Sequence, residues 1–152
     1  MENGFRSQCP ITSALDIVGD KWSLVIIKQM LFEEKATFTD FTESREAIAT
    51  NILASRLKML EGFGILRKVK PPRNRKTNIY LLTEKGLSLT PVLMELTFWS
   101  KDQIQEFHPN LNLDKQLDHA RKNKAQVCRR IVENYKERMA QWISVVDAKK
   151  PV

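Results

Sequence analysis

The sequence contains little cysteine, glycine or histidine, and each shortage argues against a class of protein. Its 152 residues include two cysteines, five glycines and two histidines. Two cysteines far apart in the chain cannot form the disulfide framework of a small secreted protein. These residues also show no spacing typical of a zinc site, and the scattered glycines form no phosphate-binding loop. We therefore expect no catalytic site, no metal and no cofactor.

Long apolar runs are also lacking. No stretch approaches the ~18 consecutive apolar residues that can span a membrane. The first ten residues, MENGFRSQCP, do not have the basic-then-apolar order of a signal peptide. A hydrophobic fraction of 42% with 28% charged residues is typical of a globular protein. The sequence therefore predicts a cytoplasmic protein that does not contact membranes.

Positive charge, by contrast, is present in excess and is concentrated in one stretch. Residues 45–85 contain ten Lys and Arg against three Glu, which equals the net charge of +7 for the whole chain. Six of these cations fall within the ten positions from Arg67 to Lys76, where no acidic residue occurs. One or two lysines could protect an edge strand against aggregation. A cluster this dense repels itself, so we expect a polyanionic partner.

Helical spacing and turn residues predict helices around a single β-hairpin. The expected helices cover residues 10–18, 21–33, 40–45, 50–63, 83–107 and 113–146, and the expected strands cover residues 65–70 and 78–82. Asp20 and Thr39 are the expected N-caps of the second and third helices. Gly62 or Gly64 is expected to end the fourth helix in a left-handed conformation. Pro91 is tolerated only in the first turns of its helix or at a kink.

The helix at residues 50–63 has an apolar stripe and an opposite polar face. Leu53, Leu57 and Leu60 recur at positions i, i+4 and i+7, so they share one side. A rotation of about 100° per residue places short or polar residues on or beside the other side. These residues are Thr50, Asn51, Ala54, Ser55 and Lys58. Asn, Ser and Thr can hydrogen-bond to base edges or phosphates, so this face is a candidate DNA-recognition surface. The simpler alternative is a solvated helix face.

The turn that follows is rich in proline and basic residues. Its tip contains four candidate contacts to phosphate or to the minor groove, Arg73, Asn74, Arg75 and Lys76. A helix followed by a cationic hairpin is the layout of a winged helix. The hairpin favours DNA over a merely solvated helix face. A protein-interaction module that presents the same basic surface to an acidic partner is the alternative function.

Several motifs occur in a fixed order along the chain. They include Cys9-Pro10, Val18-Gly19-Asp20-Lys21-Trp22, Ile48-Ala49, Arg56-Leu57, Leu60-Glu61 and Leu82-Thr83-Glu84 followed by Gly86. In this combination the sequence resembles the HxlR-type regulators, a winged helix-turn-helix family close to the MarR group. The resemblance covers about residues 9–103. Ala49 stands where the family usually has Ser, so Thr50 or Asn51 is expected to cap the recognition helix.

The resemblance implies a mainly α fold with a small β-hairpin wing and added terminal helices for dimerisation. It further implies a homodimeric transcriptional regulator that binds a pseudo-palindromic operator in double-stranded DNA, one half-site per protomer. We therefore divide the chain into an HxlR-type winged helix DNA-binding domain, residues 1–108, and a C-terminal helical extension, residues 109–152. The amphipathic extension either packs on its own domain or pairs with a partner protomer. Dimerisation is favoured, because a small winged helix offers little surface for so long a helix.

Two further features suggest how DNA binding could be controlled. Cys9 lies at the start of a helix, where the helix dipole and nearby Arg6 would favour the thiolate. Some HxlR-type proteins use a cysteine at the matching position to sense oxidants, so Cys9 is a candidate redox sensor; the alternative is a small buried residue at a dimer interface. Cys128 is expected to be structural. Four aromatic residues could line a pocket for a small-molecule effector or be plain core: Phe98, Trp99, Tyr135 and Trp142.

Overall fold

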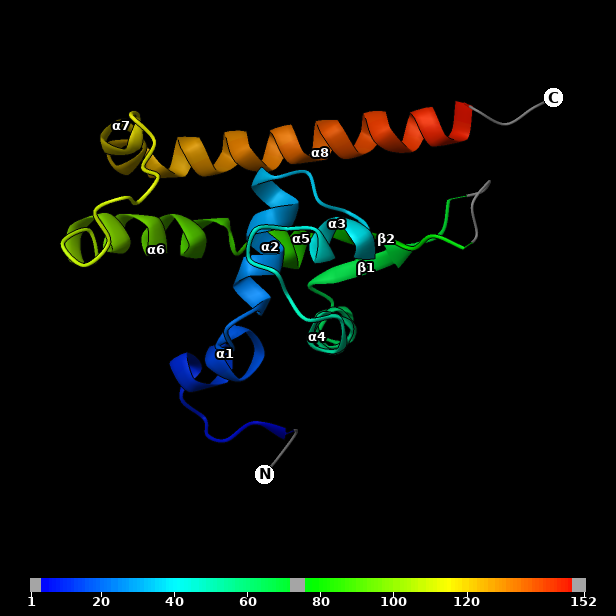
Figure 1. Ribbon diagram of the computed structural model, residues 1–152, viewed down its shortest axis with the longest axis horizontal. Helices are drawn as coiled ribbons and strands as arrows, with labels where there is room; N and C mark the ends of the chain where they lie inside the picture. The colour runs from blue at the N-terminus through cyan, green and yellow to red at the C-terminus, as the bar shows by residue number, and fades with distance from the viewer. Residues whose placement is uncertain (1–3, 72–75, 149–152) are drawn as a thin grey trace.

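The chain folds into helices arranged around one β-hairpin. The computed structural model describes residues 4–71 and 76–148, with side chains described up to Gln141. In chain order the elements are α1 (Pro10–Val18), α2 (Ser23–Phe32), α3 (Phe38–Thr42), α4 (Thr50–Gly62), β1 (Leu66–Val69), β2 (Ile79–Leu82), α5 (Glu84–Leu87), α6 (Thr90–Gln103), α7 (Leu117–Lys122) and α8 (Lys124–Ala148) (Figure 1). The predicted class, mainly α with a small hairpin, is confirmed.

The two strands form an antiparallel ladder that is extended by one residue from the segment before α3. Leu66 pairs with Leu82 and Val69 with Ile79. Thr37 forms a bridge to Ile79, and the Tyr80 N–H donates to the carbonyl of Ala36 at 2.8 Å. The hairpin is therefore attached to the body of the protein along β2, whereas β1 forms its outer edge.

The main core lies between α2, α4 and the hairpin. Ile26, Ile27 and Met30 on α2 are fully buried. From α4, the stripe of Leu53, Leu57 and Leu60 enters the same core, as the spacing predicted. Because the stripe fixes how α4 is rotated about its own axis, the opposite side of this helix faces away from the protein.

One predicted helix end is confirmed and others shift. Asp20 is wrong as the N-cap of the second helix, because α2 begins at Ser23 and Trp22 occupies the N-cap position. Gly64, with φ +70°, is the glycine that follows α4 in the left-handed conformation, whereas Gly62 lies inside the helix. Thr39 is wrong as the cap of the third helix. Thr37 caps α3 instead, because its hydroxyl accepts from the Asp40 N–H while the Asp40 carboxylate accepts from the Thr37 N–H. This reciprocal pair is a capping box, which requires an acidic residue three positions after the cap.

The two long helices expected in the C-terminal half are each divided. Residues 83–107 form α5 and α6, and Pro91 lies in the first turn of α6, where a missing N–H costs little. Residues 113–146 form α7 and α8, which are separated at Asn123. The extension therefore contains a short helix, α7, followed by a long helix, α8.

The long helix α8 packs on its own domain alongside α6 (Figure 1). The Tyr135 side chain is buried in the main core, and its hydroxyl oxygen accepts the N–H of Leu82 at 2.8 Å. Arg138 donates to the carbonyl of Leu31 at the end of α2, at 2.9 Å. The sequence left two alternatives for the extension, packing on its own domain or pairing with a partner protomer. Up to Gln141, α8 packs on its own domain. Dimerisation through this extension stays a prediction.

Candidate nucleic-acid interface

The predicted recognition face of α4 is exposed along its whole length. The structure places all five of its predicted residues at the surface: Thr50, Asn51, Ala54, Ser55 and Lys58. None of their side chains makes a hydrogen bond or ion pair to another residue in the described part of the chain. Their side chains are short except for Lys58, so the helix backbone can approach a groove closely. Contact with DNA by these residues stays a prediction.

The start of α4 differs from the expectation. Ala49 occupies the N-cap position and no side chain caps the helix, so the prediction that Thr50 or Asn51 does so is wrong. Thr50 is the first helical residue, and the turn before it brings Ala47 to φ +51°. The first N–H groups of α4 therefore have no side-chain acceptor. Such groups, at the positive end of a helix dipole, are suited to a phosphate oxygen.

The basic residues of the 45–85 stretch divide into two groups. Arg56 lies 3.6 Å from Asp20, and Lys85 donates to the Phe63 carbonyl at 2.9 Å, so both hold the fold together. A second group is exposed, and its side chains make no hydrogen bond or ion pair to another residue within the described ranges: Arg45, Lys58, Arg67, Lys68 and Lys70. This second group lies on α4, in the loop before it, on β1 and directly after β1. Its charge is therefore available to an external anion.

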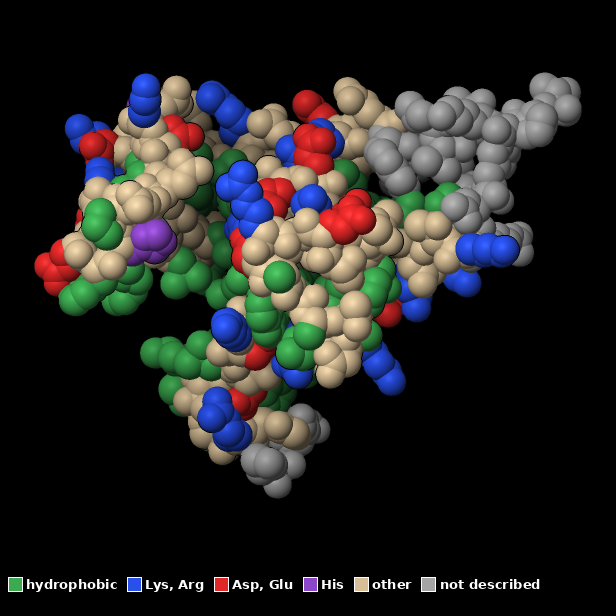
Figure 2. All heavy atoms as spheres, viewed as in Figure 1, with side chains coloured by type: hydrophobic (Ala, Val, Ile, Leu, Met, Phe, Trp, Pro, Cys, Tyr) green, Lys and Arg blue, Asp and Glu red, His purple; other side chains and the backbone are tan. Residues whose placement is uncertain are grey.

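The wing is described only at its base. Lys76 is exposed, whereas Arg73, Asn74 and Arg75 lie outside the described residues. Figure 2 shows Lys and Arg side chains projecting from the end of the hairpin, at the right of the view. The described part of the hairpin thus presents positive charge beside α4. The role of the tip stays a prediction.

The Gly-Asp-Lys-Trp motif explains how α4 is held. Asp20 accepts the backbone N–H groups of Trp22 and Ser23 at 2.9 and 3.1 Å, and so stabilises the first turn of α2. The same carboxylate lies near Arg56 of α4. Partial burial opposes its ionisation, but the hydrogen bonds from Ser23 and Trp22 together with Arg56 hold the pKa of Asp20 below its ordinary value. An ionised Asp20 therefore connects the start of α2 to α4.

Cys9 is exposed at the N-cap position of α1. The polar groups at the start of α1, first the backbone N–H and then the side chain of Thr12, followed by the N–H of Ile11, lower the pKa of its thiol. The helix start therefore acts on the thiol as expected. Arg6 does not act as proposed, because its guanidinium pairs with the Asp16 carboxylate. Cys128 is buried, in keeping with a structural role.

The segment before Cys9 reaches the end of the recognition helix. The Phe5 ring packs on the Phe63 ring, directly after α4, with 6.4 Å between their centroids. Cys9 therefore lies between α1 and an N-terminal segment that contacts Phe63, the residue directly after α4. The sequence contained no local signal for this contact, because 58 positions separate the two rings.

An exposed apolar surface on α1 and α6 was not anticipated. We call it the α1/α6 face. It consists of Ile11 and Leu15 on α1 with Val92, Leu96 and Trp99 on α6, and exposure reaches 71% at Ile11 and 57% at Trp99. Figure 2 shows apolar side chains on both sides of the hollow between these helices. The signal in the sequence was the spacing of Val92, Leu96 and Trp99, i, i+4 and i+7, beside a second apolar stripe that is buried.

The aromatic pocket considered from the sequence is not formed as expected. Phe98 and Tyr135 are buried in different clusters, whereas Trp99 is exposed. The side chain of Trp142 lies outside the described part of the chain. Phe98, Trp99 and Tyr135 therefore do not share one lining.

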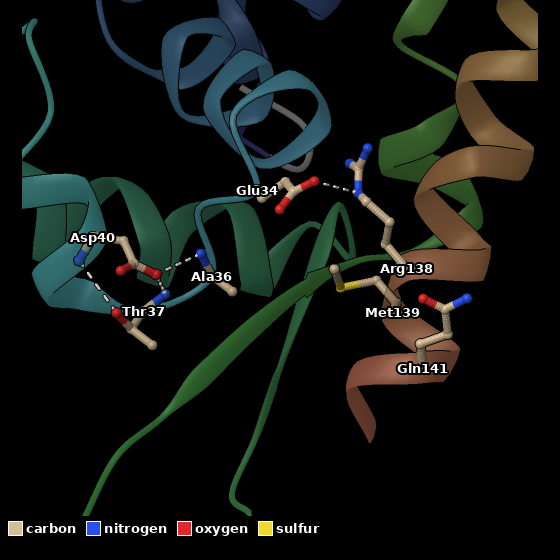
Figure 3. Close-up of a pocket in the computed structure, with 7 residues that line it drawn as sticks. All are labelled: Glu34, Ala36, Thr37, Asp40, Arg138, Met139 and Gln141. Atoms are coloured by element: carbon tan, nitrogen blue, oxygen red, sulfur yellow. Dashed lines mark hydrogen bonds and ion pairs between the residues drawn. The ribbon is translucent and has the colours of Figure 1, made fainter. Parts of the chain in front are cut away.

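A pocket does occur where α8 meets the loop before α3, and Figure 3 shows its residues. The Asp40 carboxylate accepts the N–H groups of Ala36 and Thr37 at 3.0 and 2.8 Å, and Arg138 lies 3.6 Å from Glu34. Its charged groups thus bind one another. The pocket marks where the extension docks and offers no unpaired charge to a ligand.

Residues 4–71 and 76–148 contain neither a membrane-crossing helix nor a metal-ligand cluster. No helix there is both long and apolar enough to span a bilayer. No group of three or more His, Cys, Asp or Glu side chains there could hold a metal ion.

Known proteins share both the sequence pattern and the fold. A family model described as HxlR-like helix-turn-helix matches residues 17–108. The HTH-type transcriptional regulator YodB of Bacillus subtilis (strain 168) is 36% identical over 102 residues, which cover 66% of this chain and 89% of YodB. The crystal structure of PA1607 superposes with a TM-score of 0.60 at 33% identity, over 72% of this chain and 73% of that chain. Quinone-bound YodB from B. subtilis superposes with a TM-score of 0.52 at 32% identity, over 62% and 98% of the respective chains.

Proposed function

The chain belongs to the HxlR-like helix-turn-helix family of transcriptional regulators, and from this premise we propose that it binds one operator sequence in double-stranded DNA as a cytoplasmic homodimer. The observation that carries the proposal is the exposed face of α4, whose polar side chains lie beside unpaired cations on α4 and β1. A polar helix face provides sequence readout, and the surrounding cations provide affinity for phosphate.

In this proposal α4 enters the major groove. Asn51 and Ser55 contact base edges, Ala54 permits close approach, and Thr50 with the uncapped N-terminus of α4 contacts phosphate. Lys58 and Lys68 bind the backbone beside the groove. The wing, with Arg73, Asn74, Arg75 and Lys76, follows the phosphate backbone or enters the minor groove.

We place the main dimer contact on the α1/α6 face. Five large apolar side chains of α1 and α6 are exposed to water. An exposed apolar patch on a protein marks an interaction surface. A two-fold contact through this face pairs two recognition helices, which must lie about 34–36 Å apart, or a multiple of that, to enter successive major grooves on one side of DNA. The operator is then a pseudo-palindrome.

A thiol switch at Cys9 is the proposed control. Three observations support it: the exposed thiol, its lowered pKa, and the contact of Phe5 with Phe63 at the exit of α4. YodB, a relative of this chain, has been crystallised with quinone bound. Oxidation or alkylation of Cys9 would change the conformation at the start of α1. This would displace both the N-terminal segment whose Phe5 contacts Phe63 and the α1/α6 face.

Selection of bound duplexes from a random pool tests the operator proposal. We expect enrichment of an inverted repeat, and binding that weakens steeply as salt rises. On the selected site, Asn51→Ala should cost about 1–3 kcal/mol and leave non-specific binding almost unchanged. Lys58→Ala should weaken both kinds of binding and make the salt slope shallower by about one.

Lys122→Ala is the matched control, since Lys122 is an exposed lysine on α7, away from α4. It should change neither affinity nor salt slope. If no sequence is enriched and duplex binding does not depend on salt, the chain does not act as proposed, and an acidic protein partner becomes the better explanation of its basic surface.

A further inference from the structure

The C-terminal extension closes a cavity that DNA binding does not use. The cavity lies between α6, α7 and α8, beside the end of α2, and has a volume of about 540 Å³. Figure 1 shows the arrangement of these helices. Sites for small organic molecules typically measure roughly 300–1,000 Å³. Most of its lining residues follow residue 108, where the match to the family model ends. The cavity is therefore a feature that the extension adds to the family domain.

The inner lining of this cavity is apolar. Met94 of α6 and Leu117 of α7 are buried, and Val127 and Ile131 of α8 pack against them. Phe32, at the end of α2, also lines the cavity although 45% of its surface is exposed. An apolar molecular body placed here would cover both the inner lining and the exposed Phe32 ring, and the removal of this surface from water favours binding.

One positive charge in the lining is available. The Arg130 side chain makes no hydrogen bond or ion pair to another residue within the described part of the chain. Two other arginines of the extension are engaged: Arg121 binds Asp102, and Arg138 donates to the Leu31 carbonyl. Arg130 lies one helical turn before Asn134, which also lines the cavity. A guanidinium and a side-chain amide on one side of a helix suit a carboxylate.

The other charged or titratable groups in the lining are already engaged. The Asp114 carboxylate accepts the Gln116 N–H at 2.7 Å and so stabilises its own turn. His119 Nδ1 lies 3.4 Å from the Asn123 amide nitrogen. An anionic ligand therefore meets an available partner in Arg130, whereas a cationic ligand would have to compete for Asp114.

We propose that this cavity binds a small monocarboxylate with an apolar body, a medium-chain or aromatic acid. The carboxylate pairs with Arg130 and hydrogen-bonds to Asn134, and the apolar body lies against Met94, Val127 and Ile131. A role as an effector site rests on the regulatory function proposed above, but ligand binding itself does not and is measured without DNA.

The cavity stays accessible in the proposed dimer. At about 100° per residue, Met94 and Thr97 lie on the side of α6 opposite Leu96 and Trp99. A partner protomer on the α1/α6 face therefore covers the other side of the helix.

Calorimetric titration of the full chain with octanoate tests the site, with octylamine and octanol as probes that keep the apolar body and change the head group. We expect saturable binding of one octanoate per chain, weaker binding of octanol and none of octylamine. Arg130→Gln should weaken octanoate binding at least tenfold and leave octanol binding unchanged, because only the carboxylate forms a charge-assisted bond. Arg129→Gln, a neighbouring exposed arginine outside this lining, is the matched control and should bind like the unmodified chain.

A second variant tests the location without changing charge. Ala120→Phe fills the cavity and should abolish binding of octanoate and octanol alike, with thermal unfolding measured to verify that the variant folds. The proposal is overturned by the absence of saturable octanoate binding, by equal affinity in Arg130→Gln, by equal losses in the two arginine variants, or by octylamine binding as tightly as octanoate. None of these results bears on the operator, whose selection from random duplexes succeeds or fails independently.

Discussion

At the scale of single residues, the Leu-Thr-Glu-x-Gly motif is explained by a close approach of two backbone segments. The Thr83 hydroxyl lies 2.5 and 3.0 Å from the carbonyl oxygens of Gly64 and Ile65 and accepts the N–H of Gly86 at 3.3 Å. It thus caps α5 and fixes the chain after α4. A Cβ atom on Gly86 would lie 2.2 Å from the Ile65 carbonyl oxygen, so this position has no room for a side chain.

We predict that Gly86→Ala destabilises the fold by about 1–3 kcal/mol, because backbone must move to relieve the overlap. Urea unfolding of both forms measures the difference. Gly62→Ala is the matched control, since a Cβ there meets nothing within 4 Å and the residue lies inside α4. Alanine should stabilise that helix by up to ~1 kcal/mol. Equal midpoints for the two variants would show that the approach at Gly86 is unimportant.

Asp40 links stability to pH. Burial opposes its ionisation, but the N–H groups of Ala36 and Thr37 hold the pKa of its carboxyl below the ordinary value. Because the pKa is lower in the folded state, the ionised form contributes stability above the unfolded pKa of about 3.9. That contribution is lost as pH falls through the folded pKa.

We therefore predict that Asp40→Asn lowers the free energy of unfolding near pH 7 and brings the stabilities of variant and parent closer together below about pH 4. Urea titrations at a series of pH values measure this. Glu43→Gln removes a neighbouring exposed carboxylate and should leave the pH profile nearly unchanged. A variant curve parallel to that of the parent chain at every pH would contradict the assignment.

At the scale of the elements, α8 acts as a brace for the DNA-binding part. It is connected to the last residue of β2 through Tyr135, to the end of α2 through Arg138, and to α5 through the ion pair of Lys136 with Glu84. The ion pair is exposed and contributes little. The hydrogen bond of Tyr135 is buried, so it is the connection on which the hairpin depends most.

Tyr135→Phe should destabilise the chain by about 1–3 kcal/mol, because the buried N–H of Leu82 loses its acceptor. Chemical unfolding measures the loss, and hydrogen exchange at Leu82 locates it at the base of the hairpin. Tyr80→Phe is the control: its half-buried hydroxyl makes no hydrogen bond within the described ranges, so its removal should change stability little. Unchanged hydrogen exchange at the Leu82 amide in Tyr135→Phe would contradict this role of α8.

How far the elements could be predicted depends on whether local periodicity determines them. The exposed face of α4 followed from the spacing of Leu53, Leu57 and Leu60, since a buried stripe fixes the opposite side of a helix. The packing of α8 did not follow, because an amphipathic pattern is the same for a helix on its own domain and for one on a partner. Proximity in sequence also gave a wrong prediction for Arg6. Its side chain pairs with Asp16 of α1 and does not act on Cys9.

At the scale of the whole molecule, the basic surface and the α1/α6 face lie on different elements. Cations without a partner among the described residues lie on or beside α4 and β1, whereas five exposed apolar residues lie on α1 and α6. α1 precedes α2 and Phe5 contacts Phe63, so the two surfaces are connected through the N-terminal segment. A change in how two protomers meet would therefore alter the spacing of their recognition helices.

Leu96→Glu should convert the proposed dimer to a monomer, because a buried carboxylate in an apolar contact carries a large desolvation cost. Sedimentation velocity measures the oligomeric state. Operator affinity should fall with it, since each monomer then binds one half-site alone. Gln126→Glu introduces the same charge on an exposed position of α8 and should remain dimeric. A dimer that persists in Leu96→Glu would move the interface elsewhere, and residues 109–152 would become the first candidate.

The hydrogen bond between Tyr135 and Leu82 also sets an order of events during biosynthesis. Its two partners are 53 positions apart, so the ribosome makes the hairpin well before the hydroxyl that completes it. Chains emerge from the N-terminus and are extended at roughly 5–20 residues per second. For several seconds the nascent β2 therefore has a bare N–H at its end and an uncovered core beside it. The base of the hairpin therefore gains this buried hydrogen bond only after α8 has been synthesised as far as Tyr135.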